Sequence, residues 1–319
     1  MTEIARAAEL LRAGELVAFP TETVYGLGAD AGNPEAIAKI FAAKGRPADH
    51  PLIVHLPDAA HLVRWAVEIP EAAYRLAAAF WPGPLTLILK RHPSVPDAIT
   101  GGQDTVGLRI PNHPLALQLL REFNGGVAAP SANRFGHVSP TTAAHVRDEL
   151  GTAVSLVLDG GPCAVGIEST ILDLSFVTPR ILRPGMLDAN AIGDVLGRVP
   201  EVGGTRAGPR VSGSLEAHYA PKTPLRLVAA RDIATHAQQA LDGGLRVAVL
   251  ARQSAPPSRP GLVWQTASAD SGQFAHDLYA RLRDFDALAC DLILVAAPPP
   301  GEAWRAITDR LVRAAAGSK

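Results

Sequence analysis

The chain has 319 residues, of which 47% are hydrophobic, and this is enough for two domains with cores of their own. Charged residues make up 19% and the formal net charge is -1, which excludes a strong general attraction to nucleic acid or to a membrane surface. Any polyanion must therefore be met by a local cluster of cations. Cys163 and Cys290 are the two cysteines and form no CxxC pair, so neither a disulfide framework nor a cysteine zinc site is expected.

The first 15 residues carry acidic side chains and lack the apolar segment of a signal peptide. No apolar run approaches the length of a membrane span. We therefore expect a soluble, cytoplasmic α/β protein without membrane contacts.

Helical and strand-like segments alternate over the first 200 residues. Apolar periodicity and capping residues predict helices over residues 2–13, 34–43, 58–66, 71–80, 113–123 and 141–150. Short apolar runs predict strands over residues 16–20, 52–54, 85–90, 105–110 and 126–129, and in SLVLDG, STILDLS and RILRPG. The glycine-rich stretch of residues 21–32 is expected to form a turn.

Glycines and prolines then interrupt the pattern, and residues 201–223 are predicted to form an interdomain linker. Beyond it, strands and helices alternate regularly, which favours a parallel sheet. Strands are expected over residues 225–229, 246–251, 262–266 and 291–296, and helices over residues 232–241, 273–288 and 302–314. The predicted domains are thus residues 1–200 and 224–319.

The two common nucleotide-binding glycine motifs are not found. GxxxxGK[ST] is absent, and Gly26-Leu27-Gly28 followed by Gly32 misses the dinucleotide-binding spacing. A nucleotide would have to be bound by other means.

The strongest chemical signal is KGRPADHPLIVH, residues 44–55. Lys44 and Arg46 follow a predicted helix, and Pro47 stops that helix. Arginine offers a planar fork of donors and lysine a mobile point charge, so this pair suits a polyanion. Taken alone, the pair is also what a solvated surface loop would show. We expect both side chains on a solvated loop, where alanine would remove activity without unfolding the protein.

Other polar motifs accompany this loop: PTETVYGLGAD (20–30), APSANRFGHVSP (129–140), GIESTILD (166–173) and ILRPG (181–185). Each alone has an ordinary explanation as a turn, a self-bonded side chain or a helix cap. Together, in this order, they resemble the YrdC/Sua5 family, the L-threonylcarbamoyladenylate synthases, over nearly the whole first domain. HYAP (218–221) and the tail extend the resemblance to the two-domain Sua5 form.

The resemblance implies a fold and a reaction. The first domain would be a YrdC-like twisted mixed sheet with flanking helices, and the second a smaller Rossmann-like parallel α/β domain. L-threonine, bicarbonate or CO2, and ATP would give threonylcarbamoyl-AMP and pyrophosphate, a nucleotidyl transfer with Mg²⁺ on the ATP and no organic cofactor. The product would pass to a tRNA threonylcarbamoyltransferase complex for t6A modification, and direct contact with tRNA stays open.

Two sets of site residues are implied by the resemblance. Those for ATP are Lys44, Arg46, His50, Thr105, Ser131, Asn133, Ser139, Arg183 and Tyr219. Those for threonine are Thr23, His55, Arg109, Ser169 and the backbone at Ala129. Arg109 would hold the carboxylate by bidentate geometry. Lys44 and Arg46 would stabilise charge in the transition state, and neither a general base nor a set of protein metal ligands is assigned.

The chain departs from the family pattern at two places. Position 50 is often asparagine in the family and is His50 here, so its charge would vary near neutral pH. The family linker often reads SPGMKYRHYAP, whereas this chain has VSGSLEAHYAP, with Glu216 and Ala217 in place of cations. Tyr219 is still expected to reach over the nucleotide.

Two other functions are compatible with a YrdC-like domain. One is an RNA-binding module, although the balanced charge of the chain gives little non-specific attraction to phosphates. The other is a carbamoyl-adenylate-forming enzyme of hydrogenase maturation, but those proteins add zinc fingers rich in CxxC pairs.

Overall fold

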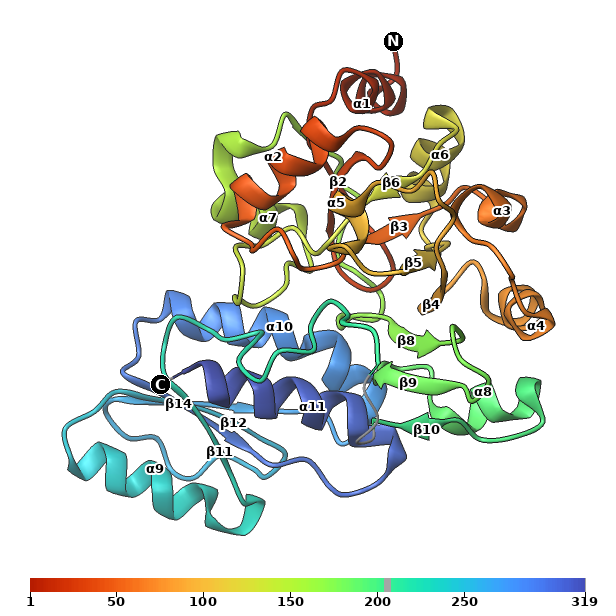
Figure 1. Cartoon of the computed structure of the whole chain (residues 1–319). Helices are drawn as coiled ribbons and strands as arrows, with labels where there is room; N and C mark the ends of the chain where they lie inside the picture. The colour runs from red at the N-terminus through yellow and green to blue at the C-terminus, as the bar shows by residue number, and fades with distance from the viewer. Residues whose placement is uncertain (204–207, 319) are drawn as a thin grey trace. The chain divides into compact units, whose positions relative to one another are not determined.

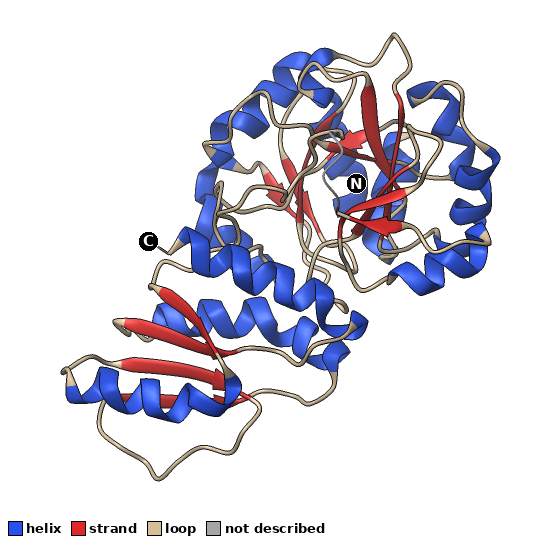
Figure 2. Cartoon of the chain, turned by 60° about the horizontal axis from the view of Figure 1, so that its bottom comes forward, coloured by secondary structure: helices blue, strands red, loops and turns tan. Residues whose placement is uncertain are grey.

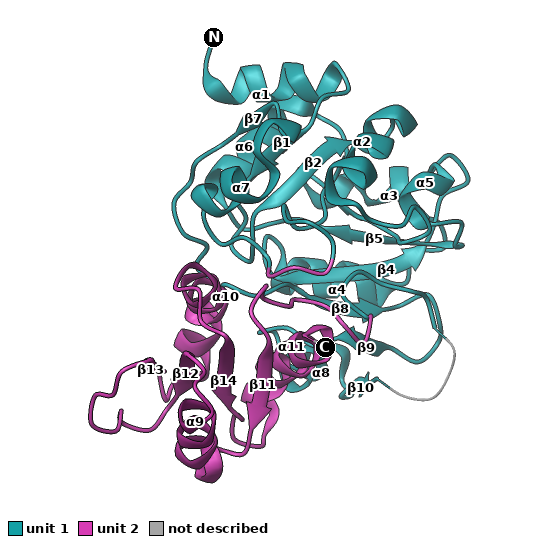
Figure 3. Cartoon of the chain, turned by 90° about the vertical axis from the view of Figure 1, so that its left-hand side faces the viewer, with its two compact units in different colours: residues 1–135, 139–214 teal, residues 136–138, 215–319 magenta. Residues whose placement is uncertain are grey.

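The computed structural model describes residues 1–203 and 208–318 (Figure 1). Two compact units are distinguished (Figure 3): the first comprises residues 1–135 and 139–214, the second residues 136–138 and 215–319. Part of the predicted linker, residues 204–207, lies outside the described residues. No helix in the described ranges is both long and apolar enough to cross a membrane.

The first unit combines helices on a large sheet. Its helices are α1 (Glu3–Arg12), α2 (Pro34–Lys44), α3 (Leu62–Trp65), α4 (Glu71–Phe80), α5 (Asp97–Thr100), α6 (Pro114–Phe123), α7 (Ala143–Leu150) and α8 (Ala189–Leu196), with 3₁₀ turns at Ala59–His61 and Gly151–Ala153. Its strands are β1 (Val17–Phe19), β2 (Gly26–Asp30), β3 (Ile53–His55), β4 (Leu85–Lys90), β5 (Thr105–Arg109), β6 (Val127–Ala128), β7 (Leu156–Val157), β8 (Thr170–Asp173), β9 (Arg180–Arg183) and β10 (Glu201–Val202).

Within the described residues these strands form one ten-stranded sheet in the order β10-β9-β8-β4-β5-β3-β6-β2-β1-β7. The sheet is mixed, because β3 and β5, β4 and β8, β1 and β7, and β9 and β10 pair in parallel, whereas the other neighbours pair antiparallel. The predicted mixed α/β fold of the first domain is confirmed.

The two faces of this sheet differ in what covers them. Alternate strand residues such as Leu87 and Leu108 pack with α2, α4, α7 and α8 in the larger core. On the opposite face, α1 and α6 pack over β1 and β6 in a second core. Over β4 and β8, that face holds a small cluster in which Val211 packs on Ile88 and Ile171.

Val211 belongs to a short segment, residues 208–214, that lies on the first unit. The backbone N–H of Arg210 donates to Gln103 Oε1 at 2.6 Å, and Gln103 Nε2 donates back to the carbonyl of Arg210 at 3.1 Å. One side-chain amide thus holds both backbone groups of Arg210, in place of a neighbouring strand.

Strand β2 corrects the sequence-based expectation, which treated residues 21–32 as a turn. Leu27 and Ala29 pack into the larger core, while Gly26 and Gly28 face Phe19 on the other side. A Cβ on Gly28 would lie 2.8 Å from the ring of Phe19. Glycine at position 28 therefore makes room for the phenyl ring within a strand and does not mark a turn.

The second unit has a four-stranded parallel sheet in the described residues, with strand order β11-β14-β12-β13. Its elements are β11 (Leu225–Val228), α9 (Ile233–Asp242), β12 (Val247–Ala251), β13 (Leu262–Thr266), α10 (Ser271–Ala287), β14 (Leu292–Ala296) and α11 (Glu302–Gly317), with a 3₁₀ turn at Ala230–Asp232. Helices lie on both sides of this sheet (Figure 2). The predicted smaller parallel α/β domain is confirmed.

Gly126, next to β6, offers a test of how tightly the first unit is packed. A Cβ at this position would lie 2.2 Å from Trp65 Cζ2 and 2.7 Å from Val54 Cγ1. We expect Gly126→Ala to lower the free energy of unfolding by about 1–3 kcal/mol, as overpacking does. Urea denaturation measures this change. Gly32→Ala is the control, because its Cβ would approach only the end of the Asp30 side chain; equal stabilities of the two variants would contradict the packing.

Candidate functional site

Lys44 lies at the end of α2, which begins at Pro34 as the sequence predicts and ends one residue later than predicted. Asn33 caps the helix by accepting from the N–H groups of Glu35 and Ala36, and Gly45 ends it in the left-handed conformation. Lys44 is only 3% exposed, and its Nζ donates to the carbonyls of Ser131, at 2.6 Å, and Asn133. Burial, and then the charge of Arg46, lower the pKa of Lys44 well below its usual value.

Arg46 is also buried, so the expected solvated loop is wrong for both cations. Its Nη2 donates to the carbonyl of Pro51 at 3.0 Å and to Ser212 Oγ at 3.1 Å, and its guanidinium lies 5.9 Å from the centre of the Phe135 ring. The reason is that residues from distant loops supply acceptors and an aromatic surface, which turns the loop into a packed element. Alanine at either position would therefore remove packing as well as charge.

His50 meets the same phenyl ring, with 5.3 Å between the ring centres. Burial, and then the charge of Arg46, lower the pKa of His50. The imidazole is therefore expected to be neutral at pH 7. From the sequence, its charge was expected to vary near this pH.

Arg183, predicted to bind ATP, contacts a residue that is predicted to bind threonine. Its Nε and Nη2 donate to the carbonyl of Ser169 at 3.1 and 3.0 Å, and Nη2 also contacts Ser169 Oγ at 3.0 Å. Its Nη1 donates to the carbonyl of Ser212 at 2.9 Å. Ser169, predicted for threonine, thus touches Arg183, predicted for ATP. Ser212 contacts both Arg183 and Arg46, and sequence reasoning missed it.

Three other residues predicted for ATP lie in the same unit. Ser131 pairs with Gly26 in an isolated β-bridge, and Asn133 is buried with its Nδ2 donating to the carbonyl of Arg134 at 2.8 Å. Thr105 begins β5 and lines a shallow groove that also includes Gln103 and Ser212. All three thus lie near Lys44 or the 208–214 segment.

Ser139 does not cap helix α7, although a serine before a predicted helix commonly does so. The N-cap of α7 is Thr142, whose side chain accepts from the N–H of His145, and the helix begins at Ala143. Ser139 is fully buried, and its hydroxyl donates to Glu168 Oε1 at 2.6 Å. The hydroxyl donates to a buried carboxylate, a charge-assisted hydrogen bond, while the capping of α7 is done by Thr142. The hydroxyl therefore contacts Glu168, which was not among the predicted residues.

His55 and Arg109 lie side by side on neighbouring strands, because β3 and β5 pair in parallel in the register His55 to Arg109. His55 is 3% exposed, and its Nδ1 has no hydrogen-bond partner among the described residues. Burial, and then the charge of Arg109, lower the pKa of His55 to about 3. The imidazole is thus neutral at physiological pH, and a bound ligand could give its orphaned nitrogen a partner.

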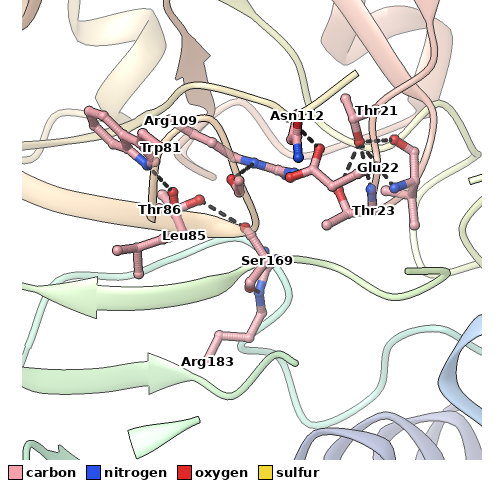
Figure 4. A network of polar contacts seen from close by, with 12 residues as sticks. Thr21, Glu22, Thr23, Trp81, Leu85, Thr86, Arg109, Asn112, Ser169 and Arg183 are labelled. Carbon is pink, nitrogen blue, oxygen red and sulfur yellow. Dashed lines mark hydrogen bonds and ion pairs between the residues drawn. The ribbon is translucent and has the colours of Figure 1, made fainter. Parts of the chain in front are cut away.

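Arg109 is held by the protein on two sides (Figure 4). Its Nη2 lies 2.7 Å from Glu22 Oε1, and its Nε donates to the carbonyl of Gly83 at 3.2 Å. Glu22 was missed by sequence reasoning; an acidic residue between two threonines, in a motif otherwise rich in glycine and apolar residues, was the signal that could have found it.

The remaining residues predicted for threonine are close by. Thr23 is fully buried, with 2.8 Å between its Oγ1 and that of Thr21. Ser169 Oγ lies 2.8 Å from Thr86 Oγ1 on β4 (Figure 4). The N–H of Ala129 donates to the carbonyl of Ile53, next to His55 on the chain, at 3.0 Å. That N–H is therefore already used by the sheet.

Tyr219 belongs to the second unit and is described there alone. It is 1% exposed and has a φ of 62°. Its ring stacks on Tyr279, with 5.9 Å between centres, and the guanidinium of Arg310 lies 5.1 Å from its centre. The N–H of Ala220 donates to the carbonyl of Gly136, also in this unit. That Tyr219 reaches over the nucleotide stays a prediction.

Neither a metal cluster nor a reactive thiol is found at these residues. Within residues 1–203 and 208–318, no three histidine, cysteine, aspartate or glutamate side chains gather as metal ligands. Cys163 is buried, and burial raises its pKa to about 12. The thiol is therefore protonated at neutral pH and a poor nucleophile.

Two family models match the chain. The model for Sua5, YciO and YrdC proteins, described as "Telomere recombination", matches residues 9–185. The chain belongs to the Sua5/YciO/YrdC family. The Sua5 C-terminal model, described as "Threonylcarbamoyl-AMP synthase, C-terminal domain", matches residues 187–316, as in the two-domain Sua5 form.

Relatives of the Sua5/YciO/YrdC family resemble this chain over both units. The threonylcarbamoyl-AMP synthase of Bacillus subtilis is 42% identical over 99% of this chain and 93% of its own length. That of Pyrococcus abyssi is 39% identical over 97% of this chain and 92% of its own. The crystal structure of P. abyssi Sua5 complexed with L-threonine has a TM-score of 0.91 and 38% identity, over 99% of this chain and 94% of that one.

The buried imidazole of His55 should make the protein sensitive to acid. Its pKa is about 3 in the folded state and about 6.5 when unfolded, so the unfolded state binds more protons between these values. This stability is complete above pH 6.5 and is lost as the pH falls toward 3. Between pH 7 and pH 5 the wild type should lose on the order of 2 kcal/mol more than His55→Gln in urea denaturation. Parallel losses in both proteins would show that His55 does not titrate in this way.

Proposed function

We propose that this chain is a threonylcarbamoyl-AMP synthase, which makes threonylcarbamoyl-AMP and pyrophosphate from L-threonine, bicarbonate or CO2, and ATP. The identity to curated synthases over both units supports this proposal. The product would go to a tRNA threonylcarbamoyltransferase for t6A modification, and we place the reaction in the cytoplasm, where ATP is supplied.

The observation that carries the proposal is the contact between Ser169 and Arg183. Ser169 belongs to the residues proposed for threonine, and Arg183 to those proposed for ATP, and three contacts of 3.0–3.1 Å join them. Two substrates that must react with each other need adjoining sites. The same contacts would be of little use to a module that only binds RNA along its surface.

The residues fit a transfer that depends on position and charge. The amino group of threonine adds to the carbon of CO2 and loses a proton, which gives a carbamate. An oxygen of this carbamate then attacks the α-phosphorus of ATP, and the bond to pyrophosphate breaks as the new P–O bond forms. Lys44, Arg46 and Arg183 would neutralise the phosphates. In its charged form Lys44 has three N–H donors and uses two for carbonyls, so one is left for a phosphate oxygen.

Mg²⁺ would enter with ATP and be held mainly by phosphate oxygens and water. Magnesium commonly binds in this way, because it keeps several waters and needs few protein ligands. No organic cofactor is included in the proposal.

Pyrophosphate release from ATP tests the function directly. We expect release that requires both L-threonine and bicarbonate, with serine a poor substitute, because the methyl group of threonine adds apolar contact. Identification of the adenylate by mass spectrometry would complete the assignment. Release that is indifferent to threonine, or that requires carbamoyl phosphate instead, would reject this substrate assignment.

Arg46→Gln tests the proposed role of the cations. Loss of one donor to the reacting phosphates should lower the rate of pyrophosphate release about 100-fold, with the KM for threonine changed less than about threefold. Arg147→Gln is the control, since it makes the same chemical change at a side chain that is 54% exposed. Because Arg46 is buried, a thermal unfolding curve of the variant must first show a cooperative transition, which indicates that the variant is folded. A wild-type rate from folded Arg46→Gln would contradict the phosphate role.

A further inference from the structure

Glu22 is a buried carboxylate that has no role in the reaction proposed above. It lies in the loop between β1 and β2, and its side chain is 7% exposed. One oxygen faces Arg109 Nη2 at 2.7 Å, and the other accepts from the N–H of Asn112 at 2.9 Å. A carboxylate in such a place needs both its partners, because a buried charge left unpaired is strongly unfavourable.

The backbone around Glu22 is fixed from both sides. The carbonyl of Glu22 accepts from the N–H of Val165 at 2.7 Å, and that of Thr23 accepts from the N–H of Gly166 at 3.1 Å. Thr21 Oγ1 accepts from the N–H groups of Thr23 and Val24, and donates to the carbonyl of Val24 at 2.7 Å. The carboxylate thus stands on a rigid turn and can impose its position on the guanidinium.

Glu22 and Gly83 together leave one side of Arg109 for a ligand. Glu22 forms an ion pair with Nη2 and the carbonyl of Gly83 accepts from Nε, while Nη1 makes no hydrogen bond within the part of the chain that is described. A guanidinium held in this way has one orientation, in which Nη1 is left as the donor for a substrate carboxylate. The family resemblance implied a bidentate hold on the carboxylate. Because Nε and Nη2 are engaged by the protein, Nη1 would make the contact instead.

We propose that Glu22 is a positioning residue for amino-acid recognition: it holds Arg109 so that Nη1 meets the carboxylate of the substrate. This inference deepens the proposed function and rests on it. Glu22 also balances the charge of Arg109. The site would therefore favour the single carboxylate of a zwitterionic amino acid, and a dianion such as a phosphate monoester would gain less there.

The experiment compares L-threonine with L-threoninol, which has a hydroxymethyl group in place of the carboxylate. Binding of each to the full chain is measured by calorimetry. The Kd of threoninol divided by the Kd of threonine reports the contribution of the carboxylate. In Glu22→Gln the preference for threonine should fall about tenfold, as expected for one displaced hydrogen bond to a charged group. Threoninol affinity should change little, because this ligand does not depend on the orientation of Arg109.

Glu15→Gln is the matched control, since it removes a carboxylate whose partner is the exposed Lys39, and its ratio should equal that of the wild type. A ratio in Glu22→Gln equal to the wild-type ratio would overturn the positioning role. A wild type that binds neither ligand would instead reject the proposed function, so the two failures are distinguishable.

If Glu22→Gln shows no cooperative unfolding transition, Glu22→Asp takes its place. Aspartate keeps the charge but is too short to reach Arg109 and Asn112 together. We then expect a fall in the ratio of at least about threefold, and an unchanged ratio would overturn the proposal.

Discussion

Buried positive charge is the constraint on which the first unit depends. Lys44, Arg46, Arg109 and Arg183 are each less than a tenth exposed. A cation taken out of water is tolerated only if acceptors surround it. Here these acceptors come from loops far apart in the sequence, among them the carbonyls of residues 131 and 133 and the backbone at 212. The contacts that build the site are therefore also contacts that hold the unit together.

The kind of acceptor differs among these cations. Lys44 donates to carbonyl oxygens, which fix its position and leave its charge to be balanced by a ligand. Arg109 faces the carboxylate of Glu22, which balances its charge. A polyphosphate needs net positive charge, whereas a single carboxylate needs one well-placed donor. The two kinds of acceptor thus match the two substrates of the proposed reaction, ATP and an amino acid.

The sequence predicted regular features well where local chemistry decides them. The start of α2 at Pro34 and the alternating strands and helices of the second unit are examples. It failed at β2, because glycine serves packing against Phe19 and this cannot be read from a single segment. The solvated loop at Lys44 failed for a similar reason, since its partners lie about 90 residues away in the chain. Family resemblance supplied the site residues, but not Glu22 or Ser212, whose importance lies in contacts.

The hold of Gln103 on Arg210 has a consequence for how this protein can change over time. Gln103 binds only the backbone N–H and carbonyl of Arg210, so this attachment does not depend on which side chain stands at position 210. Substitutions there leave the contact with Gln103 in place, with proline excepted because it lacks the N–H. They remove, however, the hydrogen bonds that Arg210 Nη2 donates to the carbonyls of Asp49, at 3.2 Å, and Gly101, at 2.8 Å. Gln103 itself has no such freedom, because few side chains carry a donor and an acceptor in this arrangement. Position 210 is thus less constrained than position 103, and a substitution there loses the side-chain part of the attachment while the backbone part remains.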